Sequence, residues 1–278
     1  MKRLIVTADD VGLHEGMTLG AVRAHRDGIV TACSVVANGR AFDHAAGLLR
    51  GCPALDVGVH LTLVEEQPIC PPARVRSLTT DEGTLPHDYR RFVARYALGR
   101  VAIADLELEL RAQIERVMGA GLAPCHLNGH QHLHVLPRIF DVVARLALEY
   151  GIPYVRIVDD RVGSGVGLGR RAAVAGLSRL GRRARSRAAA RGLRTNRGTI
   201  GVAGAGHLDA ARLIQLLGRV DGVTELVTHP GVDGETIGQS YRWRYDWDAE
   251  TAALSAPHVR EALAREGIAL CGVRGALA

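Results

Sequence analysis

The stretch "LIVTADDVG", residues 4–12, carries an apolar run that ends on two neighbouring aspartates. The apolar residues at 4–6 are typical of a buried strand. Asp9 and Asp10 repel each other unless positive charge lies nearby. Residues 11–12, Val-Gly, permit a sharp turn directly after them. We therefore expect a buried strand that carries two carboxylates at its end for a functional reason.

Six further apolar segments follow, with helical patterns between them. We predict strands at 3–8, 31–36, 56–62, 124–128, 153–158, 223–228 and 267–272. We predict helices at 105–118, where Asp105 can cap the start, at 138–150, and from Pro257 onward. This alternation indicates an α/β fold with a parallel sheet, and about seven strands in one run favour a distorted or incomplete (β/α) barrel. We expect one domain over residues 1–278, with a basic insertion at about 169–194.

Composition points to an ordinary globular protein. The chain has 278 residues, of which 47% are hydrophobic and 23% are charged. Its five cysteines have neither a metal-binding nor a redox spacing, so we expect reduced thiols and a cytoplasmic location. The longest apolar run, residues 29–37, is too short to span a bilayer.

The basic charge of the chain is concentrated in residues 169–194. This segment holds nine arginines and no acidic residue, so its positive charge exceeds the net charge of +6 for the whole chain. A cover over the active site or a dimer contact is the first interpretation, and peripheral membrane contact is the second, because Val174, Leu177 and Leu180 form a weak apolar stripe. A nucleic-acid-binding protein is the non-enzymatic alternative, but the segment lacks interleaved aromatic residues, so we expect no nucleic acid partner.

Acidic and histidine side chains lie at the ends of four predicted strands. Asp9 and Asp10 end the first, His60 lies near the end of the third, the cluster "HLNGHQHLH" at 126–134 follows the fourth, and His229 ends the sixth. Taken alone, each of these residues is typical of a turn or of a hydrogen-bonded position at the edge of a core. Because the carboxyl ends of parallel strands converge on one face, together they predict an open divalent-metal site. One Asp as ligand and the other as proton acceptor requires an irregular backbone, since neighbouring strand residues point in opposite directions.

Four motifs closely resemble the YdjC-like family of carbohydrate deacetylases, which includes chitooligosaccharide deacetylases and hopanoid-associated deacetylases. They are "ADDVG" near the start, "VGVHLTL" at 57–63, "HLNGHQHLHVLP" at 126–137 and "LVTHPG" at 226–231. The resemblance implies a (β/α)-barrel-like fold, one divalent metal ion (Mg²⁺ or Zn²⁺) and an N-acetylated amino sugar as substrate. It is also consistent with a homodimer.

The resemblance also implies roles for individual residues. Asp10, His60 and His130 match the metal ligands, Asp9 matches the catalytic base, and His229 resembles the catalytic acid. The chain departs from the family's usual pattern at Val11, where Phe is common, and at "NGH" (128–130), where "DSH" is frequent. The second change removes a carboxylate beside a metal histidine and can alter how that histidine is oriented.

The predicted reaction is metal-dependent hydrolysis of an acetamide, which releases acetate from an oligosaccharide, a glycolipid or a glycosylated natural product. The enzymatic alternative is hydrolysis of a phosphoester or a cyclic amide on the same barrel face, which metal geometry alone does not distinguish. The four motif stretches hold no lysine or arginine, and Arg138 lies just beyond the third. This favours a neutral amide over a phosphoester as the substrate.

Overall fold

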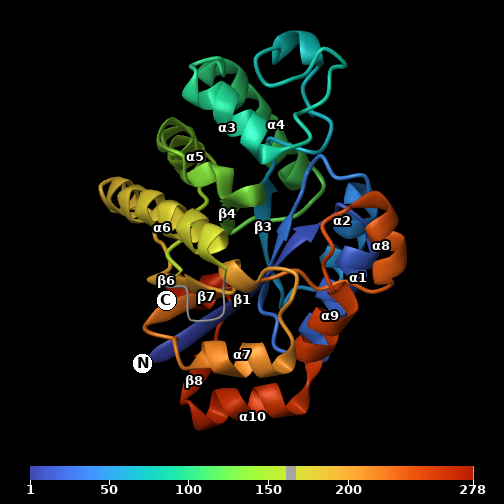
Figure 1. The fold of residues 1–278 in the computed structure, drawn as a ribbon, viewed down its shortest axis with the longest axis vertical. Helices are drawn as coiled ribbons and strands as arrows, with labels where there is room; N and C mark the ends of the chain where they lie inside the picture. The colour runs from blue at the N-terminus through green and yellow to red at the C-terminus, as the bar shows by residue number, and fades with distance from the viewer. Residues whose placement is uncertain (161–166, 278) are drawn as a thin grey trace.

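The computed structural model describes residues 1–160 and 167–277, and shows parallel strands at the centre with helices outside them (Figure 1). The strands within these ranges are β1 (Lys2–Val11), β2 (Ala32–Val35), β3 (Asp56–Leu61), β4 (His126–Gly129), β5 (Tyr154–Val155), β6 (Gly198–Ile200), β7 (Val223–Thr228) and β8 (Ile268–Leu270). The seven predicted strands are all present.

The sheet curls into an incomplete barrel. Its strands follow the order β5-β4-β3-β2-β1-β7-β6, and β8 pairs with the start of β1. The two outer segments also approach each other, because isolated parallel bridges join Tyr154 to Arg194 and Asp160 to Thr199. This arrangement confirms the predicted α/β fold with a distorted barrel, and it directs the carboxyl ends of the strands toward one face.

The helices within the described ranges cover the outside of the strands (Figure 1). They are α1 (Glu15–Arg26), α2 (Phe42–Arg50), α3 (Tyr89–Ala97), α4 (Ile103–Gly119), α5 (Pro137–Glu149), α6 (Leu168–Ala189), α7 (Ala210–Leu217), α8 (Gly234–Ser240), α9 (Trp247–Ser255), α10 (Pro257–Arg265) and α11 (Val273–Leu277). The three predicted helices correspond to α4, α5 and α10. The predicted cap was wrong: α4 begins after Ala102, and Asp105 instead accepts a hydrogen bond from the Ser77 backbone.

The sequence analysis missed β6, which is only three residues long and begins with glycine. Most of the arginine-rich segment forms α6, which lies between β5 and β6 and packs against α5. Across residues 1–160 and 167–277, none of the helices combines the length and the apolar character needed to cross a bilayer.

Candidate active site

The backbone of β1 becomes irregular where its two aspartates lie. The pairing of β1 with β2 shifts register between Ala8 and Val11, and Asp10 has a φ of 64°. A positive φ is uncommon for a residue other than glycine and marks a conformation that the surrounding structure enforces. Asp9 and Asp10 consequently meet different partners, as a division of roles between them requires.

Asp10, His60 and His130 form a buried cluster at the ends of β1, β3 and β4. Asp10 Oδ1 lies 2.9 Å from His130 Nδ1 and 3.3 Å from His60 Nε2. One ligand atom from each of the three residues lies within 4.8 Å of the other two. A carboxylate and two imidazoles that converge in this way are a donor set suited to a divalent cation.

The second ring nitrogen of each histidine in the cluster also has a partner. His60 Nδ1 lies 2.8 Å from Asn128 Oδ1, and His130 Nε2 lies 3.0 Å from Glu65 Oε2. When each ring donates its N–H to these oxygens, His60 Nε2 and His130 Nδ1 are left to face Asp10. Outer hydrogen bonds of this kind orient metal-binding histidines, so the residues present fit a divalent cation.

Asp9 points instead toward a buried arginine. Arg156 contacts both carboxylate oxygens of Asp9, with Nη2 2.9 Å from Oδ1, and its Nε donates to Glu225 Oε1 at 2.8 Å. Asn128 Nδ2 also donates to Asp9, at 3.1 Å. Burial alone would raise the pKa of Asp9, but the Arg156 guanidinium holds it well below its usual range. Asp9 is therefore ionised at neutral pH.

His229 follows β7 and completes the group. Its Nε2 lies 3.9 Å from Asp10 Oδ2, and its backbone N–H donates to Glu250 Oε1 at 2.6 Å. Burial lowers the pKa of His229, which makes its protonated form a stronger acid. Burial also raises the pKa of Glu250 to about 8. His229 thus lies beside the same carboxylate as the two histidines of the cluster.

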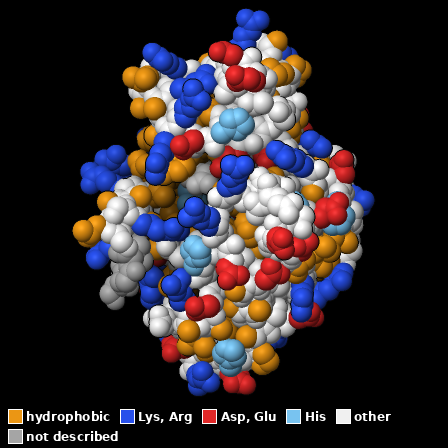
Figure 2. Space-filling model, turned by 45° about the vertical axis from the view of Figure 1, so that its right-hand side comes forward, with side chains coloured by type: hydrophobic (Ala, Val, Ile, Leu, Met, Phe, Trp, Pro, Cys, Tyr) orange, Lys and Arg blue, Asp and Glu red, His pale blue; other side chains and the backbone are white. Residues whose placement is uncertain are grey.

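Asp9, Asp10, His60, His130 and His229 line a cavity of about 810 Å³. Its other wall is largely aliphatic and comes from α6 and the turn after β4: Leu133, Leu136, Ala172, Ala173, Val174, Leu177 and Leu180. Arg90 and Arg170 also line it. Figure 2 shows a hollow on one face of the molecule with hydrophobic side chains in its wall and Lys or Arg side chains near its rim. The cavity has room for more than an acetamide.

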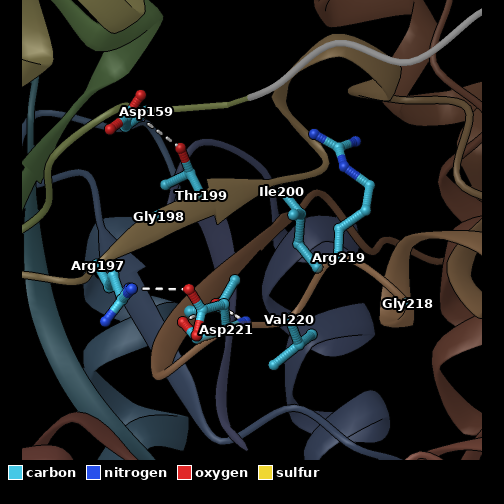
Figure 3. A pocket seen from close by; sticks show the side chains of 10 residues that line it. Asp159, Arg197, Gly198, Thr199, Ile200, Gly218, Arg219, Val220 and Asp221 are labelled. Carbon is cyan, nitrogen blue, oxygen red and sulfur yellow. Dashed lines mark hydrogen bonds and ion pairs between the residues drawn. The ribbon is translucent and has the colours of Figure 1, made fainter.

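A second cavity, of about 360 Å³, lies beside the starts of β6 and β7 (Figure 3). Its two arginines are already paired: Arg197 Nε lies 2.9 Å from Asp221 Oδ2, and Arg219 Nη2 lies 2.6 Å from Asp160 Oδ1. Its charges are neutralised locally, and it lies away from the aspartate and histidine cluster. We assign no chemistry to it.

The structure brings together all five residues that the sequence analysis selected, from the ends of β1, β3, β4 and β7. The residues selected from the sequence do not include Glu65, Arg156, Glu225 or Glu250. They also do not include Trp243 and Tyr245, which line the large cavity. Arg156 left one signal, because a lone arginine inside the apolar run "PYVRIV" suggests a buried ion pair.

The family model described as "YdjC-like protein" matches residues 3–265. The chain belongs to this family. As a YdjC-like protein, it is 39% identical over 151 residues to a carbohydrate deacetylase from Brevibacillus brevis, an alignment covering 54% of this chain and 58% of the relative. It is also 39% identical over 150 residues to a chitooligosaccharide deacetylase from Escherichia fergusonii, covering 54% and 57%. The chain thus spans somewhat more than half the length of the curated relatives it matches.

A solved structure supports the same fold over nearly the whole chain. A crystal structure from Enterococcus faecalis V583, of a protein named for cellobiose-phosphate cleavage, superposes with a TM-score of 0.76 and 26% identity. The superposition covers 98% of this YdjC-like chain and 97% of the other. The curled parallel sheet is therefore shared by both chains.

Proposed function

We propose that this protein is a hydrolase that removes the acetyl group from an N-acetylated amino sugar with the help of one divalent cation. The observation that carries the proposal is the buried Asp10–His60–His130 cluster, with an ionised Asp9 and His229 beside it in one cavity. The names of the curated relatives support an acetylated carbohydrate as substrate.

Asp10, His60 and His130 would hold the cation, Mg²⁺ or Zn²⁺. When bound, the cation would supply Lewis acidity, which polarises the acetamide carbonyl and favours loss of a proton from water. The chain itself contributes Asn128 and Glu65, whose hydrogen bonds fix the two imidazoles before any cation arrives.

Asp9 and His229 would move the protons. Asp9 is ionised and accepts the proton of the attacking water, while Arg156 fixes the orientation of its carboxylate. The ion pair with Arg156 orients Asp9 but also makes it a weaker base. Proton transfer to Asp9 would therefore require a water whose pKa is lowered. His229, in its protonated form, donates a proton to the amine nitrogen as the C–N bond breaks, and the products are acetate and a free amino sugar. Exchange with solvent then removes the proton from Asp9 and returns one to His229.

The aliphatic wall of the cavity favours a glycolipid or another sugar with an apolar substituent over a plain oligosaccharide. Seven aliphatic side chains from α6 and the turn after β4 line the cavity, alongside the polar side chains of Arg90, Gln131 and Arg170. At the start of α6, Leu168 is 83% exposed among arginines, which suits peripheral contact with an anionic membrane.

Acetate release across a panel of substrates tests the proposal. The panel pairs N-acetylglucosamine oligomers with alkyl N-acetylglucosaminides, and adds a phosphorylated sugar and a cyclic amide. We expect acetate and free amine in equal amounts from the acetylated sugars, with the alkyl glycosides turned over most efficiently. Phosphate release or ring opening without acetate would replace the proposal with the other metal-dependent hydrolysis. Arg90 and Arg170 in the cavity wall make the phosphorylated sugar a necessary control.

A further inference from the structure

Residues 241–247, "YRWRYDW", form a ladder of four aromatic rings beside the candidate active site. Aromatic and charged residues alternate along this segment: Arg242, Arg244 and Asp246 are exposed, whereas the aromatic residues are buried or half-buried. Consecutive rings lie 4.9, 5.6 and 5.8 Å apart between centroids, from Tyr241 to Trp247. These spacings are typical of aromatic packing, so the ladder is a continuous surface.

The two ends of the ladder are anchored to the fold. The Tyr241 hydroxyl lies 2.8 Å from Glu66 Oε1 and 3.1 Å from the Leu13 carbonyl oxygen. The Trp247 carbonyl accepts a hydrogen bond from the Gly231 N–H, and the Trp247 side chain is buried. The middle of the ladder is therefore held in place from both sides.

The two middle rings lie over the residues that we assign to the reaction. Trp243 is 5.4 Å from His130 between ring centroids, and Tyr245 is 5.3 Å from His229. Both rings line the large cavity together with Asp10 and remain only half-buried. Trp243 therefore lies beside the candidate cation site and Tyr245 beside the candidate acid, both on the segment between α8 and α9.

The proposed chemistry fixes where the sugar ring must lie. The acetamide carbonyl has to reach the cation held by Asp10, and the acetamide nitrogen has to face His229, whose Nε2 is 3.9 Å from Asp10 Oδ2. The sugar carbon bonded to that nitrogen consequently lies beside His229. Tyr245 covers His229 there, and Trp243 continues the same surface.

We propose that Trp243 and Tyr245 form the binding surface for the amino-sugar ring, whose C–H-bearing face packs against them. This inference rests on the proposed function and adds the orientation of the substrate. The ring lies on the aromatic ladder, and whatever the sugar carries extends toward the aliphatic wall. Trp243 is then a specificity-determining residue for a pyranose ring and has no part in moving protons.

Fluorescence of Trp243 tests this directly, because the chain contains only two tryptophans. In a Trp247→Phe variant, which leaves Trp243 as the fluorophore, we expect N-acetylglucosamine to change the emission in a saturable way. N-methylacetamide, which carries the amide without a sugar ring, should leave the emission unchanged at the same concentrations. Equal effects of both compounds, or no effect of the sugar at concentrations that saturate turnover, would overturn the assignment.

Kinetics supply the second readout. Trp243→Leu should raise KM for an N-acetylated sugar about tenfold, which corresponds to about 1.4 kcal/mol of lost binding, and change kcat far less. Trp243→Phe keeps an aromatic face and should restore most of the affinity, whereas Arg242→Ala, on the exposed side of the same segment, is the matched control. A wild-type KM in Trp243→Leu, or an equal KM increase in Arg242→Ala, would contradict the proposal.

These outcomes distinguish failure of the proposed sugar-binding surface from failure of the proposed reaction. If the wild-type protein releases no acetate from any acetylated sugar but the sugar still changes Trp243 emission, the reaction is misassigned and the sugar surface stands. If acetate is released but neither emission nor KM depends on Trp243, the reaction stands and the sugar surface is wrong.

Discussion

His60 Nδ1 lies 2.8 Å from the side-chain oxygen of Asn128, its direct partner across β3 and β4. This contact holds the proton on Nδ1 and leaves Nε2 free to face Asp10. The same Asn128 side chain donates through its nitrogen to Asp9 and to Ser34. An amide can accept on one side and donate on the other, which a carboxylate at this position cannot do when ionised.

Replacing Asn128 should therefore weaken cation binding without touching a ligand. We expect Asn128→Leu to lower the affinity for Zn²⁺ or Mg²⁺ about 10- to 100-fold, the range typical of lost outer-shell partners. Isothermal titration calorimetry measures this. Ser34→Ala removes only one outer contact of Asn128 and is the control. Wild-type affinity in Asn128→Leu would show that Asn128 does not orient His60.

Cation binding should depend on pH through His130. Burial lowers the pKa of this imidazole, but Asp10 and Glu65 raise it to about 10. His130 is therefore the doubly protonated imidazolium at neutral pH. A cation must displace that proton, because only the neutral ring is a ligand. The cation affinity should rise about tenfold per pH unit between roughly pH 7 and pH 9. An affinity that does not change over this range would contradict the assignment of His130 as a ligand.

The buried arginine below the site should be important for stability. Arg156→Met leaves the carboxylates of Asp9 and Glu225 buried without the guanidinium that pairs with them. This should lower the free energy of unfolding by about 3–5 kcal/mol. Because Arg156 lowers the pKa of Asp9, its stabilisation is present above the unfolded-state pKa of about 3.9 and is lost as the pH falls through the lower folded-state value. The difference between wild type and variant should therefore shrink below about pH 4.

Urea unfolding at several pH values measures this difference. Arg197→Met is the control, because Arg197 and Asp221 form an exposed pair whose loss should cost about 1 kcal/mol or less. Equal destabilisation by the two substitutions would show that the Arg156 ion pair contributes no special stability. A stability difference between wild type and Arg156→Met that persists unchanged at acidic pH would show the same.

The exposed arginines of α6 should matter for membrane-borne substrate only. Arg171, Arg179 and Arg183 share one side of the helix with Leu168 and do not line the large cavity. Changing all three to Gln should weaken binding to phosphatidylglycerol vesicles about a hundredfold, since each arginine near an anionic surface contributes about 1 kcal/mol.

Vesicle sedimentation and turnover on a vesicle-embedded substrate measure the effect. Turnover on a short soluble sugar should hardly change. Arg187 and Arg191 pair with Asp141, so the double change to Gln is a control that removes arginines whose charge is already partly neutralised. Equal loss of turnover on soluble and embedded substrates would point to a structural role for the three exposed arginines.

The sequence predicted the parts of this site that depend on strand order. Asp10, His60, His130 and His229 follow apolar runs, and parallel strands bring such positions to one face whatever the details of the packing. The irregular backbone at Asp9 and Asp10 was also predictable, since two neighbours can meet different partners on one face only if the backbone departs from regular strand geometry. The positive φ of Asp10 is that departure.

Other parts depend on tertiary contacts that leave no local pattern. Glu65 lies in a loop and Glu250 in α9, and neither has a spacing that links it to a histidine. β6 is too short for a hydrophobic period, and its parallel pairing with β7 is a contact between segments distant in sequence. The aromatic ladder is visible as alternation in "YRWRYDW", but its position over His130 and His229 follows only from the fold.

The central claim is that Asp10 holds the cation while Asp9 accepts a proton. The most direct measurement compares Asp9→Asn with Asp10→Asn, following cation binding by calorimetry and acetate release from an N-acetylated sugar at saturating cation. Asp10→Asn should bind the cation more weakly, because it removes a charged ligand. Asp9→Asn should bind it as wild type does, yet lose about 10²- to 10⁴-fold in kcat with a much smaller change in KM. Recovery of Asp9→Asn by added cation, or full cation affinity in Asp10→Asn, would contradict the account.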